Sequence, residues 1–160
     1  MDNMDLMPDQ KFIFGSVQIV ANQIDTLLER ELKEHHLTTK QWLLTIVVEN
    51  TFDHAPTIKE VAKGMGSSHQ NIKQVALKLE QKGFVIMEKD PKDARITRIK
   101  LTDAVASFGK KSQHKSEVFT QKLFNGITAA EMAKTRSLLK KMLTNLEEMD
   151  QEYKITGGKK

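Results

Sequence analysis

The sequence contains no cysteine. This absence excludes disulfide bonds, cysteine nucleophiles and thiolate metal sites. Only three prolines and eight glycines occur among the 160 residues, so long disordered segments are not expected away from the ends. No apolar run approaches the roughly 18 residues that a membrane-spanning helix needs, and the N-terminus lacks the basic start of a signal peptide. We therefore expect a soluble, cytoplasmic protein that does not enter a membrane.

Motifs for catalysis and metal binding are also lacking. The chain has no Gly-rich phosphate loop, no Gly-x-Ser-x-Gly sequence and no carboxylate pair in an evident cleft. Its five histidines do not show the His-x-x-x-His spacing of a helical metal site. We expect no enzymatic activity, no cofactor and no metal ion.

Charge is distributed unevenly along the chain, whose net charge is +4. The first 50 residues hold four basic and eight acidic side chains, whereas residues 67–100 hold eight basic and four acidic ones. A basic segment can bind nucleic acid, but it can equally be an ordinary solvated surface. Charge alone leaves these two interpretations open.

Helix starts are indicated by a Ser or Thr followed three residues later by Glu or Gln, the pattern of a capping box. The pattern occurs at Thr38 with Gln41, Thr57 with Glu60, Ser67 with Gln70, and Thr128 with Glu131. Apolar residues recur at helical spacing after the two middle pairs, and residues 64–66 with their two glycines separate the two segments. This arrangement predicts a helix-turn-helix.

The pattern changes from helix to strand directly after the second of these helices. Gly83 predicts the end of the helix. Residues 84–87 are a short β-prone run, residues 90–94 favour a turn, and residues 96–101 alternate between apolar and polar side chains. A basic β-hairpin after a helix-turn-helix makes a winged helix-turn-helix, so the expected fold is mainly α with a small hairpin wing.

The second helix offers a polar side for contact with DNA. In helix-turn-helix proteins the N-terminal half of this helix enters the major groove, where amides can pair with adenine and lysines can reach guanine or phosphate. The residues expected to contact DNA are Ser67, Ser68, His69, Gln70, Asn71, Lys73, Gln74 and Lys78. The alternative is an ordinary solvated amphipathic helix, but the adjoining basic hairpin favours DNA.

Three fragments, taken in order, resemble the MarR family of transcriptional regulators. They are LTTKQWLLTIVV (37–48), TIKEVAKGMGSSHQNIKQVALKLEQKGFV (57–85) and DPKDARITRIKLT (90–102). The resemblance implies a homodimeric winged-helix repressor that binds double-stranded DNA at pseudo-palindromic operators. It also implies release of the operator when a small molecule binds.

The resemblance assigns specific residues to the wing. The family's Asp-x-Arg motif falls on Asp93 and Arg95, where the acid orients a guanidinium that can enter the minor groove. Arg98 shares one hairpin face with Lys100 and is expected to contact phosphate, although a solvated edge strand would also favour these charges. The chain departs from the family in having no arginine on the recognition helix, so the operator sequence is not predicted.

Long helices with apolar stripes are expected at both ends of the chain, at residues 9–34 and 102–152. Their apolar residues recur about every 3.5 positions. Such stripes can pack within one chain or against a second subunit, and we expect a homodimer. The predicted organisation is one domain, residues 1–160, with a DNA-binding region at 37–101 and a tail at 153–160.

The resemblance implies a pocket for a small aromatic or phenolic effector between these terminal helices and the DNA-binding region. The candidate lining residues are Phe14, Trp42 and Phe52, although each is also explained as ordinary hydrophobic core. The predicted function is therefore a DNA-binding regulator, a repressor rather than an activator. The alternative is a winged-helix module for protein association, for which a basic wing carrying Arg95 would have no use.

Overall fold

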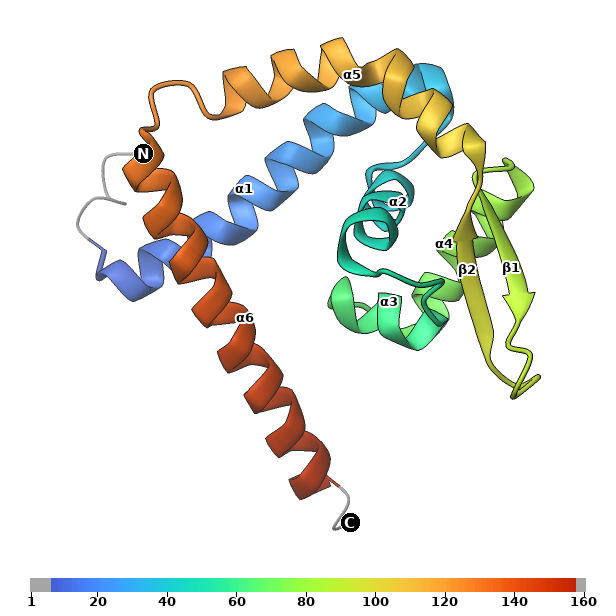
Figure 1. The fold of residues 1–160 in the computed structure, drawn as a ribbon. Helices are drawn as coiled ribbons and strands as arrows, with labels where there is room; N and C mark the ends of the chain where they lie inside the picture. Colours follow the sequence, from blue (N-terminus) through green and yellow to red (C-terminus); the bar gives the residue numbers. More distant parts are fainter. Residues whose placement is uncertain (1–6, 158–160) are drawn as a thin grey trace. The chain divides into compact units, whose positions relative to one another are not determined.

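A computed structural model describes residues 7–157 (Figure 1). In this part of the chain six α-helices, one short 3-10 helix and one antiparallel hairpin follow each other. The elements are α1 (Asp9–Leu32), η1 (Lys33–His35), α2 (Thr39–Thr51), α3 (Ile58–Gly64), α4 (His69–Gln81), β1 (Val85–Lys89), β2 (Thr97–Leu101), α5 (Asp103–Leu123) and α6 (Ala129–Gly157). The predicted fold, mainly α with a hairpin wing after a helix-turn-helix, is confirmed.

The chain divides into two compact units, and the boundary along the sequence falls between Lys111 and Ser112. The first unit contains α1 to α4, the hairpin and the first part of α5. The second contains the rest of α5 and α6. The helix-turn-helix and the wing therefore belong to one unit.

The hydrophobic core of the first unit joins the helix-turn-helix to the hairpin. Leu44 of α2, Val61 of α3, Ile72 and Leu79 of α4, and Ile99 of β2 have no exposed surface. These side chains belong to one cluster of buried residues. Burial of a leucine or isoleucine contributes about 1.5–3 kcal/mol, so this cluster fixes α4 against its neighbours.

The predicted capping boxes at Thr38, Thr57 and Thr128 are confirmed. At the start of α3, the Glu60 amide donates to Thr57 Oγ1 at 3.2 Å, and the Thr57 amide donates to Glu60 Oε2 at 2.7 Å. The equivalent reciprocal bonds begin α2 and precede α6. Each box satisfies amides that the first turn of a helix leaves without a partner.

The predicted capping box at Ser67 is wrong by one residue, because Ser68 caps α4. Ser68 Oγ accepts a hydrogen bond from the Asn71 amide at 3.2 Å. The Ser67 amide instead donates to the Ala62 carbonyl at 2.9 Å and closes the end of α3, with Gly66 in the left-handed region at φ 56°. Ser67 thus ends one helix, and the next can start only at the following residue.

Gly83 ends α4 as predicted and leads directly into the hairpin. It lies in the left-handed region at φ 76°, and the Phe84 amide donates to the Leu79 carbonyl at 3.0 Å. The strands then pair with Val85 opposite Leu101 and Lys89 opposite Thr97. The wing therefore follows the recognition helix without a linker.

The final helix is longer than the sequence suggests. Residues from 153 onward were expected to form a tail, but α6 continues to Gly157. Lys154 and Asp150 form an ion pair one turn apart on this helix, which supports the added turn. Residues 158–160 of the expected tail lie outside the described part of the chain.

Candidate nucleic-acid interface

The recognition helix α4 buries one side and exposes the other. Ile72, Val75, Ala76 and Leu79 are buried, at the helical spacing that the sequence shows. The exposed polar residues are Ser68, His69, Gln70, Asn71, Lys73, Gln74 and Lys78, and Ser67 before the helix is half-buried. The predicted DNA-contacting residues from Ser68 to Lys78 are therefore all exposed to solvent at the start of α4 and along it.

Hydrogen bonds at the start of α4 hold part of this polar side in place. Asn71 Nδ2 donates to Ser67 Oγ at 3.0 Å, while the Asn71 amide is bound by Ser68. Because these bonds restrict the Asn71 rotamer, its side chain is already oriented in the free protein. The first turn of α4 is thus an ordered polar surface.

At the tip of the wing, Asp93 holds Arg95 through two parallel contacts. Arg95 Nε donates to Asp93 Oδ1 and Arg95 Nη2 donates to Asp93 Oδ2, both at 3.0 Å. The guanidinium lowers the pKa of the Asp93 carboxyl below its ordinary value, so the acid stays ionised. The Arg95 side chain remains 91% exposed, so it is oriented yet open to a partner.

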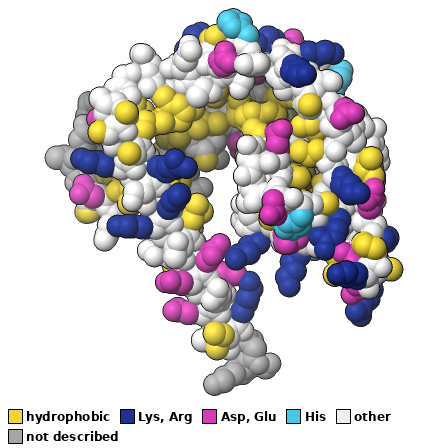
Figure 2. All heavy atoms as spheres, viewed as in Figure 1, with side chains coloured by type: hydrophobic (Ala, Val, Ile, Leu, Met, Phe, Trp, Pro, Cys, Tyr) yellow, Lys and Arg dark blue, Asp and Glu magenta, His cyan; other side chains and the backbone are white. Residues whose placement is uncertain are grey.

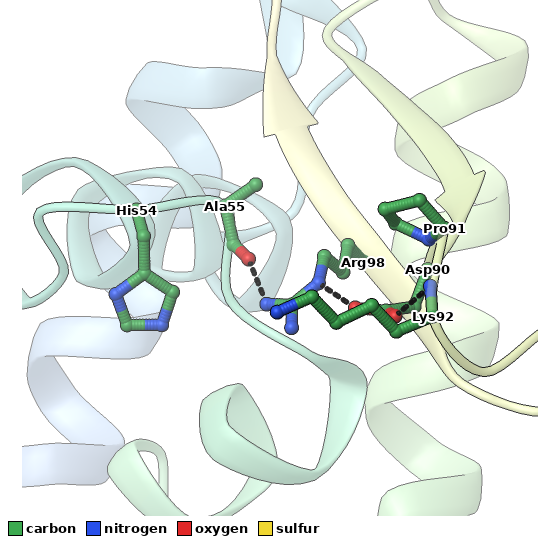
Figure 3. A pocket seen from close by; sticks show the side chains of 6 residues that line it. All are labelled: His54, Ala55, Asp90, Pro91, Lys92 and Arg98. Carbon is green, nitrogen blue, oxygen red and sulfur yellow. Dashed lines mark hydrogen bonds and ion pairs between the residues drawn. The ribbon is translucent and has the colours of Figure 1, made fainter.

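The Arg98 side chain is less exposed to solvent than that of Arg95. Its Nε donates to Asp90 Oδ2 at 2.5 Å, and its Nη1 donates to the Ala55 carbonyl at 2.8 Å. Figure 3 shows the side chain extending from β2 between these two partners. The guanidinium that was expected to contact phosphate is therefore bound to two partners within the protein, and its side chain is only 32% exposed.

Sequence analysis did not single out Asp90, which is the partner of Arg98. Only 7% of its side chain is exposed, and its pKa is lowered mainly by the hydrogen bond from Arg98. Asp90 Oδ1 also accepts from the amides of Lys92 and Asp93, at 2.8 and 3.0 Å. An Asp that begins a turn commonly accepts such amides, and this local signal was available in the sequence.

Basic side chains concentrate on the hairpin. Figure 2 shows lysine and arginine side chains in dark blue around the end of the hairpin, which Figure 1 draws at the lower right. The hairpin turn and strands carry Lys89, Lys92, Arg95 and Lys100. This local positive charge agrees with the charge distribution along the sequence and suits an anionic partner.

The three effector candidates differ in their surroundings. Trp42 and Phe52 are half-buried and pack against the core cluster, whereas Phe14 of α1 is 70% exposed. None of them lines the open hollow in Figure 3, which lies between the hairpin turn and the loop before α3. Their role in binding an effector remains a prediction.

None of the helices within residues 7–157 could span a membrane. The same residues contain no group of three or more histidine, aspartate or glutamate side chains placed to hold a metal ion.

Comparison with known proteins relates the chain to transcriptional repressors. No protein-family model matches it. The HTH-type transcriptional repressor IacR of Pseudomonas putida is 25% identical over 121 residues, which are 75% of this chain and 71% of IacR. The transcriptional repressor MprA of Escherichia coli is 22% identical over 121 residues, 76% of this chain and 69% of MprA. Both relatives are named as repressors and not as enzymes.

Solved structures share the fold over most of the chain. The transcriptional regulator SlyA has a TM-score of 0.75 and 23% identity, covering 88% of this chain and 97% of SlyA. MepR of S. aureus, solved in a complex with DNA, has a TM-score of 0.72 and 17% identity, covering 88% and 99%. CouR of Rhodococcus jostii, solved with p-coumaroyl-CoA, has a TM-score of 0.70 and 16% identity, covering 84% and 91%. The resemblance predicted from the sequence is confirmed, and the chain has the winged helix-turn-helix fold of the MarR-type transcriptional regulators.

Proposed function

We propose that this protein is a sequence-specific DNA-binding repressor that acts as a homodimer on a pseudo-palindromic operator. The proposal rests on one arrangement of side chains. Helix α4 exposes a continuous polar side, and Asp93 orients the exposed guanidinium of Arg95 at the end of the adjoining wing. A helix of this kind suits the major groove, and an oriented guanidinium suits the narrow minor groove beside it. MepR, which has the same fold, was solved in a complex with DNA, and this supports DNA as the partner.

The proposed base-reading residues are those on the first three turns of α4. Asn71, Gln70 and Gln74 can pair with adenine, and Lys73 and Lys78 can reach phosphate or guanine. Ser67, Ser68 and His69 lie at the start of the helix, where hydroxyl and imidazole groups can bind phosphate or base edges.

The homodimer is supported by apolar surface that one chain leaves uncovered. None of the described residues 112–156 is buried, although α6 carries a regular apolar stripe. Leu143 and Leu146 on that stripe are 63% and 57% exposed. Exposed stripes of this length commonly pack against a second copy in symmetric dimers. A dimer would place two copies of α4 about 34 Å apart, one turn of DNA.

Regulation by a small aromatic effector is the further part of the proposal, and the CouR complex with p-coumaroyl-CoA supports it. An effector that binds one arrangement of the terminal helices more tightly would shift the population toward that arrangement. A changed spacing between the two recognition helices would then weaken operator binding. Phe14, Trp42 and Phe52 are the proposed contacts, and salicylate and related phenols are the first compounds to test.

The test is fluorescence anisotropy with DNA from the promoter beside the protein's own gene and with a scrambled duplex. We expect selective binding to the promoter, a steep loss of affinity with salt, and about tenfold or more weaker binding by Arg95→Ala. Lys141→Ala, which removes a positive charge from an exposed position on α6 away from the apolar stripe, is the control and should bind as the wild type does.

The opposite result has a defined meaning. Weak binding that ignores both the DNA sequence and Arg95 would contradict the repressor proposal. It would favour the alternative, a winged-helix module that associates with another protein.

A further inference from the structure

We propose that the partly buried ion pair between Asp90 and Arg98 is a positioning device that sets the wing-tip residue Arg95 relative to the helix-turn-helix. The inference rests on the proposed function, because it assigns these two residues to the DNA-reading role of Arg95. Neither residue needs to touch DNA for this role.

A continuous series of hydrogen bonds leads from the helix-turn-helix to the wing tip. The Ala55 carbonyl accepts from Arg98 Nη1, and Arg98 Nε donates to Asp90 Oδ2 (Figure 3). Asp90 Oδ1 accepts from the Asp93 amide at 3.0 Å, and the Asp93 carboxylate holds the Arg95 guanidinium. Every link between the loop before α3 and the tip of the wing is thus a direct protein contact.

Backbone hydrogen bonds hold the segments on both sides of the ion pair. Ala55 lies two residues before Thr57, which caps α3, and the Ile99 amide of β2 donates to the Pro56 carbonyl at 2.8 Å. At the other end the Asp90 amide donates to the Ile96 carbonyl at 3.0 Å, which closes the hairpin turn. Asp90 therefore stabilises the turn that carries Arg95, and Arg98 links Asp90 to the loop before α3 of the helix-turn-helix.

Burial makes this pair different from an ordinary surface ion pair. The Asp90 side chain is 7% exposed and the Arg98 side chain 32%. An exposed pair contributes little, whereas removal of one partner from a buried pair leaves a charge without compensation. Glu88 and Lys100 form the contrasting case on the same hairpin, since their 2.5 Å ion pair joins side chains that are about half exposed.

Arg98 also has a geometry that lysine cannot reproduce. Its planar guanidinium directs Nε to a carboxylate and Nη1 to a backbone carbonyl at the same time. A lysine keeps the charge but presents a single point donor, so it cannot hold both partners in this fork. Arg98→Lys is therefore a mild variant that should loosen the wing without leaving Asp90 unpaired.

The experiment is a double-mutant cycle on operator affinity, with Asp90→Asn and Arg95→Ala made singly and together. We expect Asp90→Asn alone to weaken binding by roughly fivefold or more, and to add less than about twofold when Arg95 is already alanine. Arg98→Lys should behave in the same way. Glu88→Gln, which removes the same charge from the same hairpin, should leave the affinity unchanged.

Two outcomes would overturn the inference. Wild-type affinity in both Asp90→Asn and Arg98→Lys would show that the pair does not position the wing. Losses that simply add to that of Arg95→Ala would show that Asp90 and Arg98 act on DNA independently of Arg95.

A second measurement separates failure of the inference from failure of the proposed function, because it needs no DNA. By 15N relaxation, the Arg95 Nε–H and the amides of Lys92 and Asp93 should become more mobile in Asp90→Asn. Amides of the core helix α4 should keep their wild-type relaxation, and Glu88→Gln should change none of these signals. Unchanged relaxation at Arg95 in Asp90→Asn would overturn the inference whether or not the wild type binds DNA.

Discussion

Lys82 Nζ donates a hydrogen bond to Gln41 Oε1 at 2.8 Å and so ties the end of the recognition helix to the start of α2. The same ammonium donates to the carbonyl of His36, a residue in the left-handed region at φ 53°. Gln41 Oε1 also accepts the Thr38 amide in the capping box of α2. One lysine thereby joins α4 to both the capping box and the connection that follows α1.

Substitution of this lysine should weaken the fold. We expect Lys82→Met to lower the free energy of unfolding by about 1 kcal/mol, because the His36 carbonyl and Gln41 Oε1 each lose the hydrogen bond from Lys82. Urea unfolding followed by circular dichroism measures the change. Lys78→Met on the same helix removes the same charge from an exposed position and should change stability little. Equal stabilities of the two variants would contradict the role assigned to Lys82.

Substitution of Gln74 should change DNA recognition without changing the stability of the protein. Its side chain is exposed on the second turn of α4. We expect Gln74→Ala to weaken binding to the preferred operator by about 1–3 kcal/mol and to relax selectivity at one base pair, with an unchanged melting temperature. Anisotropy titrations against single-base operator variants measure the effect.

Gln81 provides the control for this experiment. It is also exposed but ends α4, away from the N-terminal half that enters the groove. Gln81→Ala should keep both affinity and selectivity. A uniform loss over all operator variants in Gln74→Ala would place this residue at a phosphate instead of a base.

Position 83 requires glycine because of its backbone conformation, and not because room for a side chain is lacking. An added Cβ would meet nothing within 4 Å, but φ is 76°, a conformation that disfavours L-residues. We expect Gly83→Ala to destabilise the protein by about 1–2 kcal/mol in urea unfolding. Gly109→Ala in α5 also meets nothing within 4 Å, yet should stabilise by about 0.5–1 kcal/mol, because a helical glycine loses more entropy on folding. Destabilisation by both variants would contradict this explanation.

Features that depend on neighbours in the chain could be predicted from the sequence. The boxes at Thr38 and Thr57 join residues three positions apart, and Gly83 ends a helix through bonds to the preceding turn. The polar side of α4 follows in the same way from helical periodicity. Local rules placed one helix cap a residue too early, because the Ser67 amide closes the end of α3. They also ended the final helix at residue 152, although it continues to Gly157.

Features that join distant parts of the chain could not be predicted in this way. Arg98 is 43 residues from its partner Ala55, and Lys82 is 41 residues from Gln41. The alternating pattern of β2 predicted two faces of the strand. It gave no indication that the segment before α3 pairs with the edge of β2, where Thr57 lies opposite Arg98 and the Ile99 amide donates to the Pro56 carbonyl. The burial of Asp90 depends on this tertiary contact and was therefore missed.

His54 should make stability depend on pH near neutrality. Its Nδ1 lies 2.8 Å from Asp53 Oδ1 and its Nε2 lies 3.3 Å from Glu60 Oε1. These carboxylates, Asp53 first, raise the pKa of His54 above its ordinary value of 6.5. A raised folded-state pKa gives a stabilising contribution that is complete below the ordinary value and is lost as the pH rises through the raised one.

Melting temperatures of the wild type and His54→Gln measure this contribution. We expect the wild type to be more stable at about pH 5.5 and the difference to shrink toward about pH 8.5. A constant difference between wild type and His54→Gln over this range would exclude the ionic contribution.

The apolar stripe of α6 should control the oligomeric state. We expect Leu143→Glu together with Leu146→Glu to give a monomer in analytical ultracentrifugation at micromolar concentration, because two carboxylates cannot be buried in a subunit contact without compensation. The wild type should sediment as a dimer. Operator binding by the variant should fall steeply, since a monomer can engage only one half-site at a time. Lys141→Glu, an exposed residue on the same helix, should remain dimeric. A wild-type monomer at this concentration would contradict the homodimer, and a dimeric double variant would assign the contact to another surface.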